Sequence, residues 1–351
     1  MSLHETAREQ VEAKRLLQAA LDEGPAHAYL FHGPPGVGKR PLARAFGREL
    51  LGTTRRTHPD LYELEALGEM IRIDAIRELR RDLHMRPFEA DRRVYLIHSA
   101  HLLGDDAADA LLKDLEEPPS YAVIVLIADD LGPIPETIRS RCQLVPFRRL
   151  SERAIREVVD ARAPELDEER RVALARVAGG RLDRVERLLD PQAVSRRVTL
   201  LEQARAAYRE PAFEPATAAA ALLACARERG SEAKAVEEAN VSGLELTSRE
   251  SDQRVRRAQR GAEREELLAQ LEELEAWYRD LVVVGVGAER AAVHVDRLGE
   301  LRDDATRERL VGAEHAAEAV RETWRKLEEF NLAPQLALEA LFVEISHELR
   351  A

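Results

Sequence analysis

The stretch from Gly33 to Arg40, GPPGVGKR, has the glycine spacing and the lysine of a phosphate-binding loop. A short apolar run precedes it at Ala28 to Phe31, and apolar residues recur after it at helical spacing. In such a loop the glycines let successive backbone N–H groups point at phosphate oxygens, and the following helix adds its positive end. The flanking strand and helix favour this interpretation over a simple Gly/Pro-rich turn. The predicted phosphate-loop residues are Gly33, Gly36, Gly38 and Lys39.

The last position of this motif departs from the pattern. Where the motif has a Ser or Thr hydroxyl for Mg²⁺, the chain has Arg40, which offers no acceptor and whose charge repels a metal ion. Pro41 follows and removes one of the backbone N–H donors of the first helical turn. We therefore predict a vestigial phosphate loop, disabled by Arg40 and Pro41, and no required cofactor; these residues argue against ATP or ADP binding.

The composition predicts a largely helical protein with one modest sheet. Charged residues make up 34% and aromatic residues 4% of the 351 residues. The net charge of −12 argues against nucleic-acid binding through bulk charge, but leaves a local basic patch open. The cysteines, Cys142 and Cys225, support neither a disulfide framework nor a zinc ribbon, and the apolar runs are too short for a membrane span. We expect a soluble cytoplasmic protein.

Apolar runs and helical patterns alternate through the first part of the chain. The predicted strands are Ala28–Phe31, Leu61–Leu64, Arg93–Ile97 and Ala122–Ala128. The predicted helices are Val11–Ala28, the segment after the phosphate loop, Arg72–Leu83 and Asp105–Glu117. This alternation predicts a parallel sheet whose ligands lie beyond the carboxyl ends of the strands.

The end of the predicted strand Arg93–Ile97 lacks the acids of a nucleotide hydrolase. Such an enzyme needs one carboxylate to hold Mg²⁺ and one to orient the attacking water. Here the strand is followed by His98 and Ser99. His98 and His101 have a spacing that metal ligands can use. The competing interpretation is that this strand end has no catalytic role.

Three segments carry a specific resemblance. They are His27 to Lys39, Ala110 to Pro119 with its helix end LEEPP, and the triplet Ser140-Arg141-Cys142. Together they resemble the clamp-loader branch of the AAA+ ATPases, and within it the delta-prime family of bacterial DNA polymerase III subunits. The similarity is good over roughly residues 10 to 190. Beyond that it rests on helical character and on the stretch from Asn331 to Glu339.

The resemblance implies a fold and a set of partners. The fold would be an α/β P-loop (AAA+) module with a parallel sheet at residues 1–150, a small helical lid at 151–190 and an all-α collar for oligomerisation at 191–351. The implied partners are motor subunits of the gamma/tau type and a delta subunit, in a hetero-oligomeric ring at the bacterial replisome. During DNA replication such a ring places a sliding clamp on primer-template DNA.

The resemblance also implies a role for the triplet. In this family the arginine between Ser140 and Cys142 reaches the nucleotide of the neighbouring motor subunit, so Arg141 is the predicted arginine finger, acting in trans. A guanidinium suits that role because it is planar and permanently charged. The alternative is a surface or capping arginine in a loop.

Several departures from the motor subunits point to a subunit that does not hydrolyse ATP. Arg40 and Pro41 stand in the phosphate loop, and His98 and Ser99 replace the acidic pair. Where motors have a Thr after the central strand, this chain has Ala128 and Asp129. The zinc-binding insertion of the family is also absent, because Gly52 to His58 contains no cysteine, so we expect no zinc and no other metal.

The rest of the chain is predicted to be helical. The lid would contain Ala154–Ala161, Glu168–Val177 and a third helix, and Arg181 and Arg184 stand where motors keep a phosphate-sensing arginine. Arg227 to Glu273 is predicted as one long, partly solvated helix. The basic residues on it either contact phosphates or an acidic partner or form a solvated face. They are Arg254, Arg256, Arg257 and Arg260.

Three functional hypotheses follow. The first is a catalytically silent clamp-loader subunit that supplies Arg141 to a motor. The second is a stand-alone AAA+ ATPase that remodels DNA or protein complexes, favoured only by the intact Lys39. The third is a pure binding module that uses its collar helices, with Arg141 irrelevant.

Overall fold

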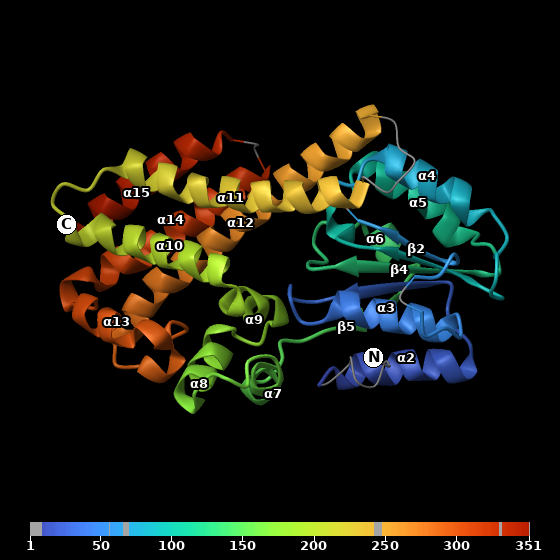
Figure 1. The fold of residues 1–351 in the computed structure, drawn as a ribbon, viewed down its shortest axis with the longest axis horizontal. Coiled ribbons are helices and arrows are strands. Elements are labelled where there is room, and N and C mark those ends of the chain that lie inside the picture. The colour runs from blue at the N-terminus through green and yellow to red at the C-terminus, as the bar shows by residue number, and fades with distance from the viewer. Residues whose placement is uncertain (1–8, 56, 66–69, 242–247, 330–331, 351) are drawn as a thin grey trace. The chain divides into compact units, whose positions relative to one another are not determined.

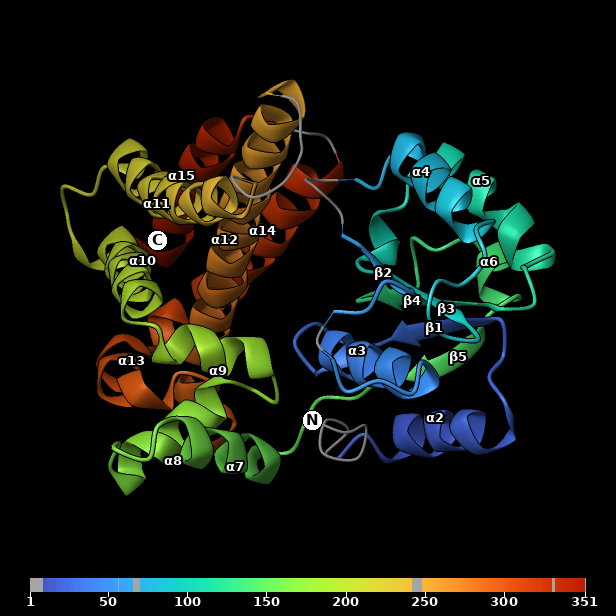
Figure 2. The same ribbon diagram turned by 45° about the vertical axis from the view of Figure 1, so that its right-hand side comes forward.

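The computed structural model describes residues 9–55, 57–65, 70–241, 248–329 and 332–350. The chain forms two compact units (Figures 1 and 2). One comprises Met1–Val158 with Gly180–Arg184, and the other Val159–Gly179 with Val185–Ala351. The segment 151–190 contributes to both units, and the division into three domains stays a prediction. No helix in the described ranges is long and apolar enough to cross a membrane.

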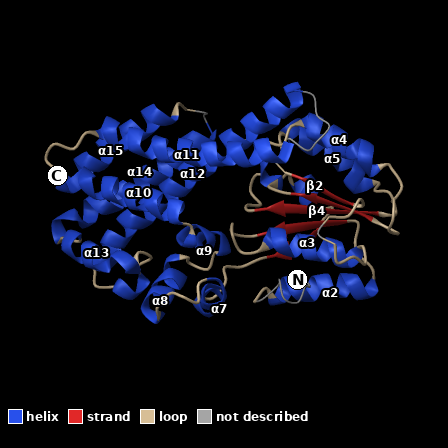
Figure 3. Ribbon diagram, viewed as in Figure 1, coloured by secondary structure: helices blue, strands red, loops and turns tan. Residues whose placement is uncertain are grey.

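A parallel sheet forms the centre of the first unit, and all strands of the described residues lie in it (Figure 3). Its order is β2-β3-β4-β1-β5, so β4 separates β1 from β3. All the pairings are parallel, as predicted from the alternation of strands and helices. The strands are β1 Ala28–His32, β2 Leu61–Leu64, β3 Arg93–Ile97, β4 Ala122–Ala128 and β5 Gln143–Pro146.

Apolar side chains alternate across this sheet and build two cores. In β1, Tyr29 and Phe31 pack with the helices α2 and α3, whereas Leu30 packs with α4, α5 and α6 on the other face. Each face is covered, which explains why β4 is buried along its whole length. These helices are α2 Val11–Glu23, α3 Lys39–Leu50, α4 Ile73–Leu83, α5 Asp105–Glu116 and α6 Glu136–Arg139, with a short 3₁₀ turn at Ala100–Leu102.

The second unit is helical in the described residues. Its longer helices enclose one core around Trp277, Tyr278 and Phe342, all fully buried. The helix α7, Glu152–Arg162, spans the boundary between the units, and α9 begins in the first unit. The other bounds are α8 Glu168–Val177, α9 Leu182–Leu189, α10 Pro191–Arg209, α11 Pro215–Val241, α12 Ser248–Gly285, α13 Leu298–Asp304, α14 Leu310–Glu329 and α15 Pro334–Arg350. Short 3₁₀ turns occur at Glu289–Ala291, Val295–Arg297 and Arg307–Arg309.

The prediction of one long helix from Arg227 to Glu273 is wrong. Two helices, α11 and α12, cover this range and pack against each other. Gln270 bonds to Leu222 O over 3.2 Å, and Arg254 pairs with Glu237 further along, so the helices run antiparallel. The charged face of α12 lies partly against α11, where Arg254 pairs with Glu237.

Two further predictions need correction. The strand β5 was not predicted, because Gln143–Pro146 is short, partly exposed and ends in proline. It forms because β1 leaves an edge free, with Tyr29 paired to Gln143. The helix predicted over Val11–Ala28 ends earlier, at Glu23, because Gly24 takes a φ of 105° and Pro25 follows.

Candidate functional site

The predicted phosphate loop lies between β1 and α3, at the carboxyl edge of the sheet. Gly33, Gly36 and Gly38 all have positive φ, at 137°, 69° and 96°. This conformation favours glycine over any residue with a Cβ. At Gly33 a Cβ would also lie 2.2 Å from the backbone oxygen of Phe147. The sequence motif therefore forms a tightly curled loop at the start of a helix.

Lys39 is satisfied by the chain itself. Its Nζ bonds to Gly33 O and Pro34 O, both over 2.5 Å, and to an Asp129 carboxylate oxygen over 2.7 Å. An ammonium group has three N–H donors, so these contacts use all of them. The Lys39 side chain is 4% exposed, and burial lowers its pKa although Asp129 acts in the opposite direction.

A second carboxylate closes the loop. Leu182 N donates to Gly36 O over 2.7 Å, at the start of α9. This places Asp183 so close that a Cβ on Gly36 would lie 1.7 Å from Asp183 Oδ1. Arg181 holds Asp183 through two bonds, Nε to Oδ1 at 3.1 Å and Nη2 to Oδ2 at 2.6 Å. Burial opposes ionisation of Asp183, but the Arg181 bonds outweigh it and lower the pKa.

The replaced motif positions also contact one another. Arg40 Nη2 donates to Ser99 Oγ over 3.0 Å, which links the metal position of the loop to the end of β3. His98 is fully buried and its Nε2 lies 2.8 Å from Glu63 Oε2 on β2. Arg44 of α3 binds the same carboxylate, with Nε at 3.0 Å and 2.9 Å from its two oxygens. Burial opposes ionisation of Glu63, yet the bonds from His98 and Arg44 lower its pKa to about 2.

One group within the described ranges has the spacing of metal ligands, and it consists of Glu63, Glu65 and His98. His101 is not part of it; its Nδ1 accepts from Asp129 N over 3.2 Å. Arg44 lies 2.8 Å from Glu63 and 3.5 Å from Glu65, so a guanidinium already supplies the positive charge between the two carboxylates. We interpret this group as an internal ion-pair cluster.

The residues around the loop do not fit a magnesium nucleotide. Lys39 has no donor left for a phosphate, and the carboxylates of Asp129 and Asp183 would repel one. Arg40 offers a metal ion a positive charge and no oxygen ligand.

Arg141 lies at the amino ends of the parallel strands, whereas the phosphate loop lies at their carboxyl ends. It precedes β5, whereas the loop follows β1, and the two strands are parallel neighbours with Tyr29 level with Gln143. At about 3.3 Å per residue, the length of β1 and the flanking residues separate Arg141 from Gly33 by roughly 15–20 Å. An arginine side chain does not bridge that distance. Arg141 and the loop of the same chain therefore do not form one site.

Arg141 is held locally. Its Nη1 donates to Thr137 O over 2.8 Å, and its Nη2 lies 2.5 Å from Glu116 Oε1. The Arg141 side chain is 35% exposed. Ser140 Oγ donates to the same Thr137 oxygen over 3.1 Å, and burial raises the pKa of the Cys142 thiol to about 12. The triplet thus presents one partly exposed guanidinium, next to a thiol that stays protonated at neutral pH.

Two residues that complete the loop were missed in the sequence analysis. Gln10 Nε2 donates to Val37 O over 3.3 Å and to Arg148 O over 2.7 Å, and Arg148 N donates back to Gln10 Oε1 over 3.0 Å. Asp183 was also missed. Both are polar residues beside ordinary helix starts, so no local sequence signal marks them.

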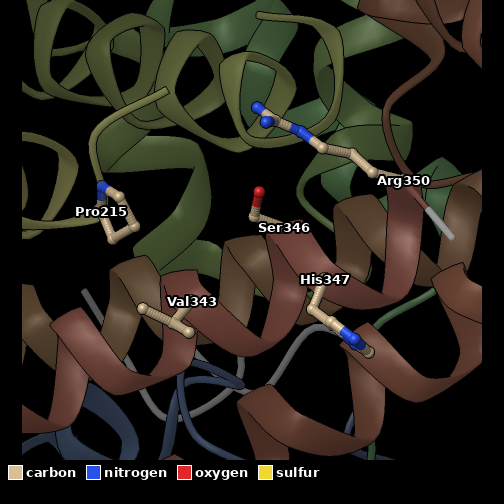
Figure 4. Close-up of a pocket in the computed structure, with 5 residues that line it drawn as sticks. All are labelled: Pro215, Val343, Ser346, His347 and Arg350. Carbon is tan, nitrogen blue, oxygen red and sulfur yellow. The ribbon is translucent and has the colours of Figure 1, made fainter. Parts of the chain in front are cut away.

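The second unit carries a shallow pocket on α15 beside the start of α11 (Figure 4). Ser346 and His347 are adjacent on one helix, where consecutive side chains do not face each other, so they do not form a catalytic pair. Arg350 donates to Ala207 O over 2.9 Å. The pocket is lined by Pro215, Val343, Ser346, His347 and Arg350.

Comparisons with known proteins point to one family. The family model described as "DNA polymerase III, delta subunit" matches residues 9–151. DNA polymerase III subunit tau of Bacillus subtilis is 33% identical over 203 residues, which cover 52% of this chain and 36% of that protein. Subunit delta′ of Pseudomonas aeruginosa is 36% identical over 136 residues, covering 33% of this chain and 42% of that protein. Subunit delta′ of Bacillus subtilis is 34% identical over 148 residues, covering 38% and 45%.

The chain spans less than half the length of each of these relatives. A solved DNA polymerase III gamma-subunit-related protein from Thermotoga maritima aligns with 97% of this chain and 100% of its own, at 18% identity and a TM-score of 0.46. The range that the family model matches contains the phosphate loop, LEEPP and Ser140-Arg141-Cys142. Residues 9–151 are therefore similar to DNA polymerase III subunits of the delta′ and tau type, which are components of clamp loaders.

Proposed function

We propose that this chain is a non-hydrolysing subunit of a DNA polymerase III clamp loader. It assembles with gamma/tau-like motor subunits and a delta subunit, and supplies Arg141 in trans to a motor's nucleotide. Through the complex it contributes to ATP-dependent loading of a sliding clamp onto primed DNA during replication. It needs no nucleotide or metal of its own.

The observation that carries this proposal is the placement of Arg141 at the edge of the sheet opposite the phosphate loop. A guanidinium that stabilises a transferring phosphoryl group must contact it directly. Because its own loop is out of reach, Arg141 has a phosphate to contact only on a neighbouring chain. Its partial exposure suits that role.

The state of the phosphate loop supports the non-hydrolysing part of the proposal. Lys39 bonds to three oxygens of its own chain, and Asp183 packs against Gly36. His98 and Ser99 provide neither of the carboxylates that hydrolysis needs. A stand-alone ATPase would have to release Lys39, move Asp183 away from Gly36 and obtain its two carboxylates from residues other than His98 and Ser99.

The test is ATP hydrolysis, stimulated by clamp and primed DNA, in the reconstituted complex. The samples are this chain alone, the cognate motor and delta subunits without it, and the full set with wild type or Arg141→Ala. Arg139→Ala is the matched control, two residues away on α6. We expect no turnover by the chain alone, stimulation by the wild type, and loss of at least about ten-fold of that stimulation with Arg141→Ala.

Each component of the proposal has its own contrary result. Turnover by the chain alone, abolished by Lys39→Ala, would identify it as an ATPase. Full stimulation by Arg141→Ala, with assembly confirmed by gel filtration, would make it a scaffold that acts through its helical unit. Equal losses in Arg141→Ala and Arg139→Ala would indicate damage to the loop instead of a missing finger.

A further inference from the structure

We propose that Glu116 is a positioning residue for Arg141: it holds the guanidinium in the free subunit and competes with the neighbour's phosphate for it. This inference rests on the proposed function. The geometry joins two segments that the sequence leaves apart. Glu116 belongs to the LEEPP segment at the end of α5, and Arg141 belongs to the triplet before β5. Their side chains meet with Nη2 2.5 Å from Oε1.

The negative charge of Glu116 destabilises the end of α5 but suits an ion pair with Arg141. Glu116 is the last residue of α5, where the helix dipole disfavours a negative charge. Arg141 compensates that charge. The backbone around Glu116 is fixed, because Leu115 is buried and Pro118 and Pro119 follow the helix. The carboxylate is therefore presented to Arg141 by a rigid element.

The Glu116–Arg141 pair is weak enough to exchange. The Glu116 side chain is 48% exposed and that of Arg141 is 35% exposed. Ion pairs at such exposure contribute about 0.2–1 kcal/mol, which corresponds to a factor of about 1.4 to 5 in an equilibrium. A phosphate offers the same planar fork more charge and more acceptor oxygens than one carboxylate does. A neighbour's nucleotide can thus displace Glu116 from Arg141, and the broken ion pair lowers the affinity for that nucleotide by the same small factor.

Arg141 keeps a second support when Glu116 is neutralised. Its Nη1 bonds to Thr137 O over 2.8 Å, and Ser140 Oγ bonds to the same oxygen. The variant Glu116→Gln therefore removes the competing charge and keeps the loop in place. Glu117→Gln is the matched control, because Glu117 is the next residue and is not the carboxylate that pairs with Arg141.

The first experiment needs no partner. The intact chain is treated with phenylglyoxal, which modifies guanidinium groups, and the modification of Arg141 is followed by peptide mass mapping. Arg148, whose side chain is 85% exposed, is the internal reference. We expect Glu116→Gln to raise the rate at Arg141 relative to Arg148 by about two- to five-fold, and Glu117→Gln to leave it unchanged. Glu116→Ala should behave like Glu116→Gln, and equal rates in wild type and both Glu116 variants would overturn the proposal.

The second experiment uses the reconstituted complex with its cognate motor and delta subunits. With Glu116→Gln we expect the KM of the motor for ATP to fall about two- to five-fold, with kcat unchanged, because competition for Arg141 is lost. A KM that stays constant or rises would contradict the competition. A purely structural role would lower kcat or assembly instead.

The two experiments separate this inference from the function on which it rests. If Arg141→Ala leaves motor activity intact, the proposed function fails, whatever the reactivity of Arg141. If Arg141→Ala removes the stimulation but Glu116→Gln changes neither reactivity nor KM, the function stands and the role of Glu116 is refuted.

Discussion

The Arg40 guanidinium donates a hydrogen bond to Ser99 Oγ over 3.0 Å. The bond joins the position where a phosphate loop holds its metal-binding hydroxyl to the position where a hydrolase holds an acid after its third strand. This chain has neither group at these positions, and the residues that stand there contact each other. Restoring one of them alone should therefore not restore chemistry.

Arg40→Thr tests this coupling. We expect ATP hydrolysis by the isolated chain to stay at the buffer background, because His98 and Ser99 still supply no carboxylate. The free energy of unfolding should change by less than about 1 kcal/mol, since Arg40 is exposed. Turnover is measured by phosphate release and stability by urea titration. Hydrolysis above background that disappears in Lys39→Ala would contradict the prediction.

The double variant Asp129→Ala, Asp183→Ala should open the phosphate loop to anions. It frees one donor of Lys39 and removes both carboxylates that face the loop. We expect pyrophosphate to bind at least about ten-fold more tightly than to the wild type in calorimetric titrations. Asp130→Ala is the control, because Asp130 bonds only to the nearby Gly132 N in the described structure. Unchanged affinity would show that the carboxylates do not block the loop.

Alanine substitutions at two glycines of similar backbone conformation distinguish the cost of backbone strain from the cost of a side-chain clash. Gly36 has φ 69° and its Cβ would lie 1.7 Å from Asp183, whereas Gly52 has φ 62° and open space. Gly52→Ala should cost about 1 kcal/mol from the backbone alone, and Gly36→Ala about 2–3 kcal/mol. Thermal unfolding provides the comparison. Adding Asp183→Ala to Gly36→Ala should recover part of the lost stability. No recovery would show that contact with Asp183 does not cause the destabilisation.

The stability conferred by Glu63 should depend on pH. Burial opposes its ionisation, but His98 and Arg44 hold its pKa at about 2, below the usual 4.5. Because the folded pKa is the lower one, ionised Glu63 stabilises the fold above pH 4.5, and this contribution declines as the pH falls toward 2. Glu63→Gln should therefore lose about 1–2 kcal/mol at pH 7 and about half of that at pH 3.

Urea unfolding at both pH values measures this difference. Glu65→Gln is the control, since Glu65 is half exposed and lies 3.5 Å from Arg44. It should change stability by less than about 1 kcal/mol at either pH. A pH-independent loss in Glu63→Gln would indicate a packing defect instead of a lost charge.

The parts of the fold that follow from local pattern were predictable from the sequence. The strands β2, β3 and β4 have the predicted bounds, because each is an apolar run between polar turns. The strand β5 was not predictable, because Gln143–Pro146 becomes a strand only through the free edge of β1. The division of Arg227–Glu273 into α11 and α12 was missed because Glu- and Arg-rich helical patterns lie on both sides of residues 242–247, which are outside the described ranges.

The candidate site also contains some residues that the sequence predicts and some contacts that it does not. The loop glycines, Lys39 and Arg141 are recognisable from their motifs, although their roles remain predictions. The contact of Lys39 with Asp129 depends on β4 lying beside β1, with His32 level with Ala128. The contact of Gly36 with Asp183 depends on where α9 starts. Such contacts arise from the register of distant elements, which no local pattern contains.

The division of the sheet into packed faces and open strand ends has a consequence for the evolution of this fold. The alternating side chains of β1, β3 and β4 fill the two cores, whereas Lys39, Ser99 and Asp129 stand beyond the ends of these strands. Substitutions at those ends alter the chemistry and leave the packed faces untouched. After a gene duplication, one copy can therefore lose a catalytic group without losing its ability to fold. The same separation lets the residues at these strand ends be substituted together while the two packed cores stay intact.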